Sequence, residues 1–183
     1  MNSYCDIAAS DGSGSMKAYL AMPAGKPKAG IVVVQEILGV NKDVRAMTDA
    51  WAASGYAAIA PDLFWRLKPS VELDADIPDE FQEGLDLMQK FNADKSVEDL
   101  ASNIAALRSR GCAKVGVVGY CLGGRLAFLC AIRTDSDATV GYYGVGLDNL
   151  LGERQNISSR CCCISRRATN SRHPRPRLRS ALR

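Results

Sequence analysis

Short runs of β-branched and apolar residues alternate along the chain with longer segments in which apolar positions recur every three to four residues. The run Gly30-Ile31-Val32-Val33-Val34-Gln35 is apolar on both faces, which is typical of a central strand in a parallel sheet covered on both sides. Strands alternating with helices predict an α/β fold whose mostly parallel sheet is flanked by helices. Strand patterns occupy residues 17–22, 30–35, 57–60, 115–119 and 139–143.

Capping residues suggest where the helices begin and end. Asn41 is a good N-cap for a helix that runs to Ser54, with Gly55 as its stop. Ser96 is the predicted N-cap of a second helix, which ends at Gly111, and Glu98 and Asp99 in its first turn suit the helix dipole. Periodicity alone predicts further helices over residues 79–91 and 122–132, and residues 63–78 read as a long loop.

Charge divides the chain into two unequal parts. Residues 1–153 hold 14 basic and 20 acidic residues, a formal charge of −6, whereas residues 154–183 hold nine arginines, no lysine and no acid, a charge of +9. Arginine, serine, proline and cysteine cannot build an apolar core. The sequence therefore predicts one folded domain over residues 1–153 and an arginine-rich, disordered tail over residues 154–183.

Composition excludes several classes of protein. The apolar runs are too short to cross a bilayer, which needs about 20 residues. The N-terminal residues do not show a basic stretch followed by an apolar one, so we expect no secretory signal, no membrane partner and a cytoplasmic location. Cysteines in that compartment stay reduced, so the seven of this chain do not indicate disulfides.

The sharpest local signal is Gly119-Tyr120-Cys121-Leu122-Gly123, which follows a buried strand and opens a helix. This is the nucleophile-elbow pattern, with cysteine as the nucleophile and small residues, Gly119 and Gly123, two positions to either side. The amide of Leu122 can stabilise an oxyanion, and a helix N-terminus is expected to lower the pKa of Cys121. The alternative is a buried cysteine at a tight turn between a strand and a helix.

These motifs together resemble the dienelactone hydrolase (carboxymethylenebutenolidase) family, over about residues 8–153. The resemblance implies an α/β-hydrolase fold and a hydrolase of lactone or ester bonds, of the type that converts dienelactone to maleylacetate in aromatic degradation. It implies no cofactor. The matching segments are Gln35-Glu36-Ile37-Leu38-Gly39-Val40-Asn41, Gly55-Tyr56-Ala57-Ala58, Pro61-Asp62-Leu63, residues 115–124 and Gly141-Tyr142-Tyr143-Gly144-Val145-Gly146.

The resemblance also assigns roles within the site. Cys121 matches the nucleophile, and Glu36 matches the glutamate that contacts the resting thiol and helps to form the thiolate. The alternative for Glu36 is a solvated charge at a strand end. The amides of Ile37 and Leu122 match the two oxyanion donors. An arginine that the family uses for a substrate carboxylate has no match near residues 79–84.

The catalytic aspartate and histidine of the family's triad have no match in this chain, because the family pattern stops after Glu153. The single histidine, His173, stands in an arginine-rich context and is expected to be a solvated side chain. Asp148 is another candidate acid, but it is more simply a loop residue. We therefore expect this chain to be inactive or impaired as a hydrolase.

A change of reading frame between Glu153 and Arg160 would explain the altered composition. Residues 160–166 can be encoded by CGC TGC TGC TGC ATC TCG CGG, and reading from the third base gives Leu-Leu-Leu-His-Leu-Ala, the pattern of a buried strand. The codons of residues 167–171 then permit Ala-Gly-Asp-Glu-Phe, which resembles the family's turn that bears the aspartate. Because the codons are assumed, the frameshift is a hypothesis.

A second class of function also fits the charge pattern. Nine arginines in the tail could contact phosphates, so the alternative to a hydrolase is a non-catalytic protein that binds nucleic acid through its tail. The tail has no aromatic residue for base stacking, which counts against this alternative. The spacing of Cys161, Cys162 and Cys163 does not suit a zinc site. We expect a monomer that binds a small ester or lactone and no metal.

Overall fold

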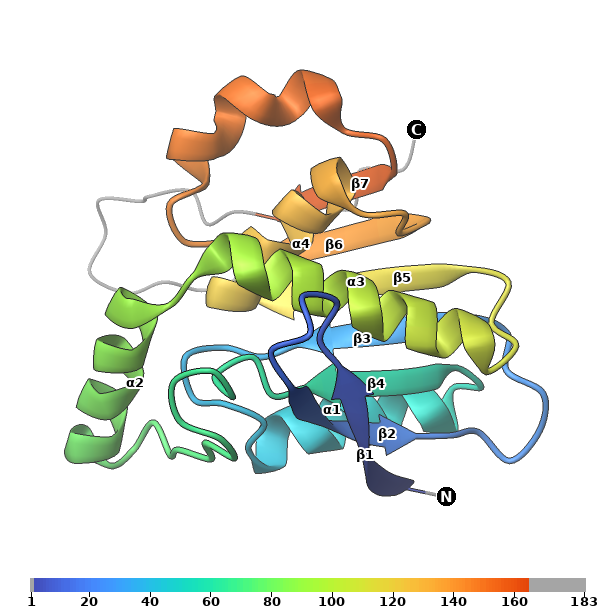
Figure 1. Cartoon of the computed structure of the whole chain (residues 1–183), viewed down its shortest axis with the longest axis horizontal. Helices are drawn as coiled ribbons and strands as arrows, with labels where there is room; N and C mark the ends of the chain where they lie inside the picture. Colours follow the sequence, from blue (N-terminus) through green and yellow to red (C-terminus); the bar gives the residue numbers. More distant parts are fainter. Residues whose placement is uncertain (1, 165–183) are drawn as a thin grey trace.

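Seven strands form one sheet in the order β1-β2-β4-β3-β5-β6-β7, in the computed structural model that describes residues 2–164 (Figure 1). Strands β4 to β7 are parallel to β3, and β1 and β2 extend the sheet in antiparallel pairing. This arrangement confirms the predicted α/β fold. The strand bounds are β1 Asn2–Ala8, β2 Ser15–Ala21, β3 Gly30–Val34, β4 Ala57–Pro61, β5 Val115–Tyr120, β6 Ala138–Tyr142 and β7 Arg160–Ile164.

Helices cover both faces of the sheet. Helix α1 (Lys42–Ala53) packs on one face, where Val44 meets Val33 of β3. Helices α3 (Ala93–Ser109) and α4 (Leu122–Arg133) pack on the other, where Leu100 and Leu126 join the larger core. Helix α2 (Pro78–Lys90) projects from one side, and the 3-10 helix η1 (Leu147–Asn156) lies beyond α4 (Figure 1).

The predicted N-cap residue is confirmed for α1 and wrong for α3. The side chain of Asn41 accepts hydrogen bonds from the backbone N–H groups of Asp43 and Val44, as an N-cap should. For α3 the cap is Asn92, not Ser96, because the Asn92 side chain accepts from the N–H of Lys95. Ser96 lies one turn inside the helix, where its hydroxyl donates to the Asn92 carbonyl.

An ion pair on α3 holds the long loop after β4 against the core. The side chain of Asp99 is 1% exposed and accepts from the Nε and Nη2 atoms of Arg66 at 3.1 and 2.8 Å. The indole N–H of Trp65 donates to the same carboxylate at 2.9 Å. The sequence suggested that Asp99 serves the helix dipole, but its position in the second turn and its burial make it a tertiary anchor.

Two strands lie outside the sequence-based prediction. Strand β1 pairs along its whole length with β2 and forms one edge of the sheet. At the other edge, β7 pairs in parallel with β6, although it belongs to the segment that was predicted to be disordered from residue 154. The unpaired N–H and C=O groups of an open sheet edge can hydrogen-bond to an extended peptide whatever its side chains. The remainder of the predicted tail, residues 165–183, lies outside the described residues.

Candidate active site

Sheet register places three residues in one row at the carboxyl ends of neighbouring strands. Val34 of β3 pairs with Gly119 of β5, and Gly119 pairs with Gly141 of β6. Glu36, Cys121 and Tyr143 each lie two residues beyond these partners. The connections from β3 and β5 leave in opposite directions along the sheet, and the crevice at such a switch point is where open α/β sheets bind ligands. The row is therefore a candidate active site.

The turn at Cys121 has the geometry of a nucleophile elbow. Cys121 itself has φ 53° and ψ −114°, a conformation that is strained for a residue with a side chain. A Cβ at Gly119 would clash with the carbonyl of Gly123, and a Cβ at Gly123 would lie 2.5 Å from the carbonyl oxygen of Val34. Both glycines are thus required by close backbone packing, as the elbow pattern predicted.

Hydrogen bonds from two neighbouring segments hold the elbow. The N–H of Cys121 donates to the carbonyl of Tyr142 at the end of β6, at 3.0 Å. The carbonyl of Cys121 accepts from the N–H of Arg125 in α4 and from that of Val145 after β6, at 3.2 and 3.3 Å. These bonds fix the strained backbone, so that the direction of the thiol is set by the fold.

The thiol of Cys121 is half-buried, and burial decides its pKa. Removal from water raises the pKa of the Cys121 thiol, and the nearby charge of Glu36 raises it further. The N–H of Leu122 donates to the sulfur and acts in the opposite direction, but it does not win. The prediction that the helix N-terminus leaves this thiol with a lowered pKa was therefore wrong. The resting group is a thiol that needs a proton acceptor.

Glu36 is not a free surface charge at a strand end. It is half-buried, and its Oε1 atom accepts a 3.2 Å hydrogen bond from the hydroxyl of Tyr143. Tyr143 has φ 41° and a side chain that interacts electrostatically with both Glu36 and Cys121. Sequence reasoning quoted Tyr143 only within a motif. The signal that could have found it is its position directly after a strand of the sheet, like Glu36 and Cys121.

The other predicted site residues fall into three groups. The side chains of Ile37 and Leu122 are buried beside the row, and the N–H of Leu122 points at the Cys121 sulfur. The role of the Ile37 amide as an oxyanion donor remains a prediction. Asp148 is exposed on η1 and is not hydrogen-bonded to any of these groups. His173 lies outside the described residues.

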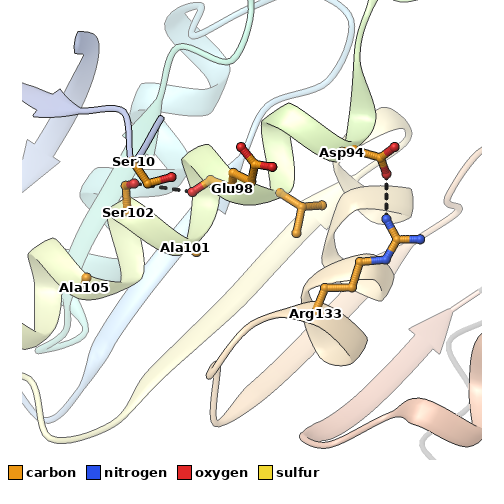
Figure 2. Close-up of a pocket in the computed structure, with 8 residues that line it drawn as sticks. Ser10, Asp94, Glu98, Ala101, Ser102, Ala105 and Arg133 are labelled. Carbon is orange, nitrogen blue, oxygen red and sulfur yellow. Dashed lines mark hydrogen bonds and ion pairs between the residues drawn. The ribbon is translucent and has the colours of Figure 1, made fainter. Parts of the chain in front are cut away.

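The cavities of residues 2–164 include three of about 500, 360 and 280 Å³, and Cys121 lines none of these three. The largest of the three, about 500 Å³, lies along the outer face of α3, where the Asp94–Arg133 ion pair closes one end (Figure 2). Its other lining side chains are short or acidic, and the hydroxyl of Ser102 donates to the backbone carbonyl of Glu98 rather than to its carboxylate (Figure 2). A second cavity, of about 280 Å³, is lined in part by Leu122, the residue that follows Cys121 in the elbow.

Residues 2–164 show neither a membrane-spanning helix nor a cluster of metal-ligating side chains. Among the helices of residues 2–164, none combines the length and the apolar character that a bilayer crossing requires. Within that range, three or more His, Cys, Asp or Glu side chains do not gather anywhere in a way that could hold a metal ion. The sulfur atoms of Cys161 and Cys163 are 3.8 Å apart on β7, and this pair is too small to count as such a cluster.

Comparisons with known proteins show which family the chain belongs to. The model of the dienelactone hydrolase family matches residues 16–165, past Glu153, where the sequence-based resemblance ended. A relative from Azospirillum brasilense is 45% identical over 152 residues, which is 79% of this chain and 64% of the relative. Carboxymethylenebutenolidase 1 of Cupriavidus pinatubonensis is 40% identical over 139 residues, 74% of this chain and 58% of its own length.

Solved structures show the same fold. A crystal structure from Klebsiella pneumoniae superposes with a TM-score of 0.72 at 24% identity, covering 92% of this chain and 85% of the other. The chain spans between 58% and 64% of the length of the two curated relatives. Because the family model matches residues 16–165, which is most of the sequence, the chain belongs to the dienelactone hydrolase family.

Proposed function

We propose that the protein cleaves a lactone or ester bond through Cys121. The observation that carries the proposal is the strained elbow, with the N–H of Leu122 directed at the Cys121 sulfur and Glu36 in the same row of the sheet. Family membership supports this chemistry, and the name of the Cupriavidus relative supports a small lactone as the substrate.

The first half of the reaction uses groups that the fold brings together. Glu36 accepts the proton of Cys121, and the thiolate then attacks the carbonyl carbon of the substrate. The amides of Leu122 and Ile37 stabilise the oxyanion. Collapse of the tetrahedral intermediate breaks the carbon–oxygen bond, so that the oxygen leaves with the electron pair, takes up a proton and leaves a thioester on Cys121.

The second half of the reaction needs a base that activates water. Residues 2–164 contain no histidine, and His173 is the single histidine of the chain. Glu36 is already hydrogen-bonded to Tyr143. We therefore expect Cys121 to become acylated and the thioester to be hydrolysed slowly, so that turnover is impaired.

Acylation by p-nitrophenyl acetate tests the proposal. Intact mass spectrometry and peptide mapping should find one acetyl group on Cys121, with little steady-state release of nitrophenol after the first turnover. Cys121→Ala should lose the acetyl group, whereas Cys5→Ser, which removes another half-buried thiol, should keep it. Acetylation that persists elsewhere in Cys121→Ala at the wild-type rate would disprove the role of Cys121.

A further inference from the structure

An arginine without a counterion lies beside the elbow. Arg125 is half-buried in the first two turns of α4, and among residues 2–164 its side chain makes no hydrogen bond or ion pair. Its Nε atom is fully buried and lacks a partner in this part of the chain. Within residues 2–164 the guanidinium charge is thus not paired with an acid, and its outer nitrogen atoms, not the buried Nε, are the ones that can meet an acceptor from outside.

This arginine lines the cavity of about 280 Å³ that begins at Leu122. The other residues around that cavity are apolar or glycine: Met88, Phe91, Ala93, Leu122, Val145 and Gly146. They come from the end of α2 and the residue after it, the starts of α3 and α4, and the segment after β6. The cavity therefore offers one cation and an apolar wall, and it contains no acid that could neutralise the guanidinium.

The start of α4 adds to the positive potential. The helix has 12 residues and no acidic side chain in its first turn, so its N-terminal end is not neutralised by its own sequence. A cation in this position is disfavoured unless an anion lies nearby. A planar carboxylate can accept from two N–H groups of a guanidinium at once, which a point-like acceptor cannot do.

We propose that this cavity binds a small organic carboxylate, whose charged end pairs with Arg125 and whose apolar body packs against Phe91, Met88 and Val145. Cys121 and Glu36 do not line the cavity, so binding there does not require the thiol or the carboxylate of the proposed hydrolytic chemistry. The carbonyl of Cys121 accepts from the N–H of Val145, which makes the cavity a direct neighbour of the elbow.

Titration of ¹⁵N-labelled protein with sodium benzoate tests the proposal. The amide signals of Leu122 and Val145 should shift in a saturable way, and benzamide, which has the same shape without the charge, should not produce these shifts. Arg125→Gln should weaken benzoate binding at least about tenfold, because a charge-assisted pair is lost. Arg154→Gln is the matched control, since it removes an exposed arginine and should leave the affinity unchanged.

Two further binding measurements distinguish the carboxylate site from its alternatives. Cys121→Ala should bind benzoate as the wild type does, so failure of the hydrolase proposal would leave this one standing. Inorganic phosphate should bind more weakly than benzoate, because it lacks an apolar body. Equal binding of benzoate and benzamide, equal binding of phosphate, or an unchanged affinity in Arg125→Gln would each overturn the carboxylate site.

Discussion

The hydroxyl of Tyr143 lies 3.2 Å from the Oε1 atom of Glu36, so that a residue after β6 and a residue after β3 meet across the end of β5. Burial raises the pKa of Tyr143 to about 12, and the charge of Glu36 adds to this effect. The phenol therefore stays protonated at neutral pH and remains a donor. The contact joins Glu36 to the backbone segment that also holds Cys121.

Replacing Glu36 by Gln should make Cys121 more acidic. The carboxylate raises the pKa of the thiol, so removing its charge should lower that pKa. The midpoint of the pH profile for iodoacetamide labelling of Cys121 should move to lower pH, because the thiolate is the reactive form. Glu98→Gln on the outer face of α3 is the control. A midpoint that does not move would mean that Glu36 does not face the thiol.

Replacing Tyr143 by Phe should have the opposite effect on the same profile. The hydroxyl draws negative charge on Glu36 away from Cys121, so its loss should move the midpoint upward by less than about one pH unit. Tyr120→Phe is the matched control, because the ring of Tyr120 stacks on Tyr142 without bonding to Glu36.

A double-mutant cycle distinguishes an effect of Tyr143 on Cys121 through Glu36 from a general loss of packing. In the Glu36→Gln background, Tyr143→Phe should have almost no further effect on Cys121 labelling, because the carboxylate that it acts through is gone. An equal shift in both backgrounds would show that Tyr143 acts on the thiol directly.

Gly123→Ala should destabilise the protein by roughly 3 kcal/mol, since its new methyl group would be forced against backbone. The Cβ would lie 2.5 Å from the carbonyl oxygen of Val34 and 2.7 Å from that of Gln35. Urea unfolding measures the change. Gly25→Ala is the control, because a Cβ at Gly25 meets no atom within 4 Å. A stability equal to that of the control would contradict the tight packing of α4 on β3.

Asp99→Asn should cost about 3 kcal/mol in the free energy of unfolding, because it leaves Arg66 without its buried partner. The neighbouring Glu98→Gln removes an exposed charge that pairs with Lys95 and should change stability by less than about 0.5 kcal/mol. Urea denaturation of the two variants makes the comparison. Similar losses would show that burial of Asp99 contributes little.

The coding DNA tests the frameshift hypothesis. We expect that one base lost or gained between codons 153 and 160 restores a frame encoding Leu-Leu-Leu-His-Leu-Ala. Amplification and sequencing of this region from the source DNA is the measurement. A clean reading of the present frame would refute the hypothesis.

The central sheet and the elbow could be predicted because local signals and tertiary structure agree there. Apolar runs with β-branched residues form β3 and β5, and Gly119 is required by its close contact with the backbone of Gly123, four residues away. Gly123 fits the same local elbow pattern, although its own close contacts are with Val34 and Gln35 at the end of β3. The start of α3 could not be fixed in the same way. Both Asn92 and Ser96 are good N-caps, and the choice depends on how the helix packs.

Features that depend on distant partners were missed. Asp99 looked like a residue for the helix dipole, and its pairing with Arg66 across 33 positions has no local signature. Tyr143 reaches Glu36 across 107 positions, so its role follows only from the sheet register. The pKa of Cys121 was predicted with the wrong sign, because burial cannot be judged from one turn of sequence.

Strand β7 pairs with β6 through its peptide groups, and most of its side chains are exposed. Every amino acid other than proline supplies both the N–H and the C=O group that this pairing uses. A sheet edge of this kind can therefore pair with segments of very different sequence. Regular secondary structure at the edge of a sheet therefore gives little information about ancestry, whereas the identities of buried side chains give more.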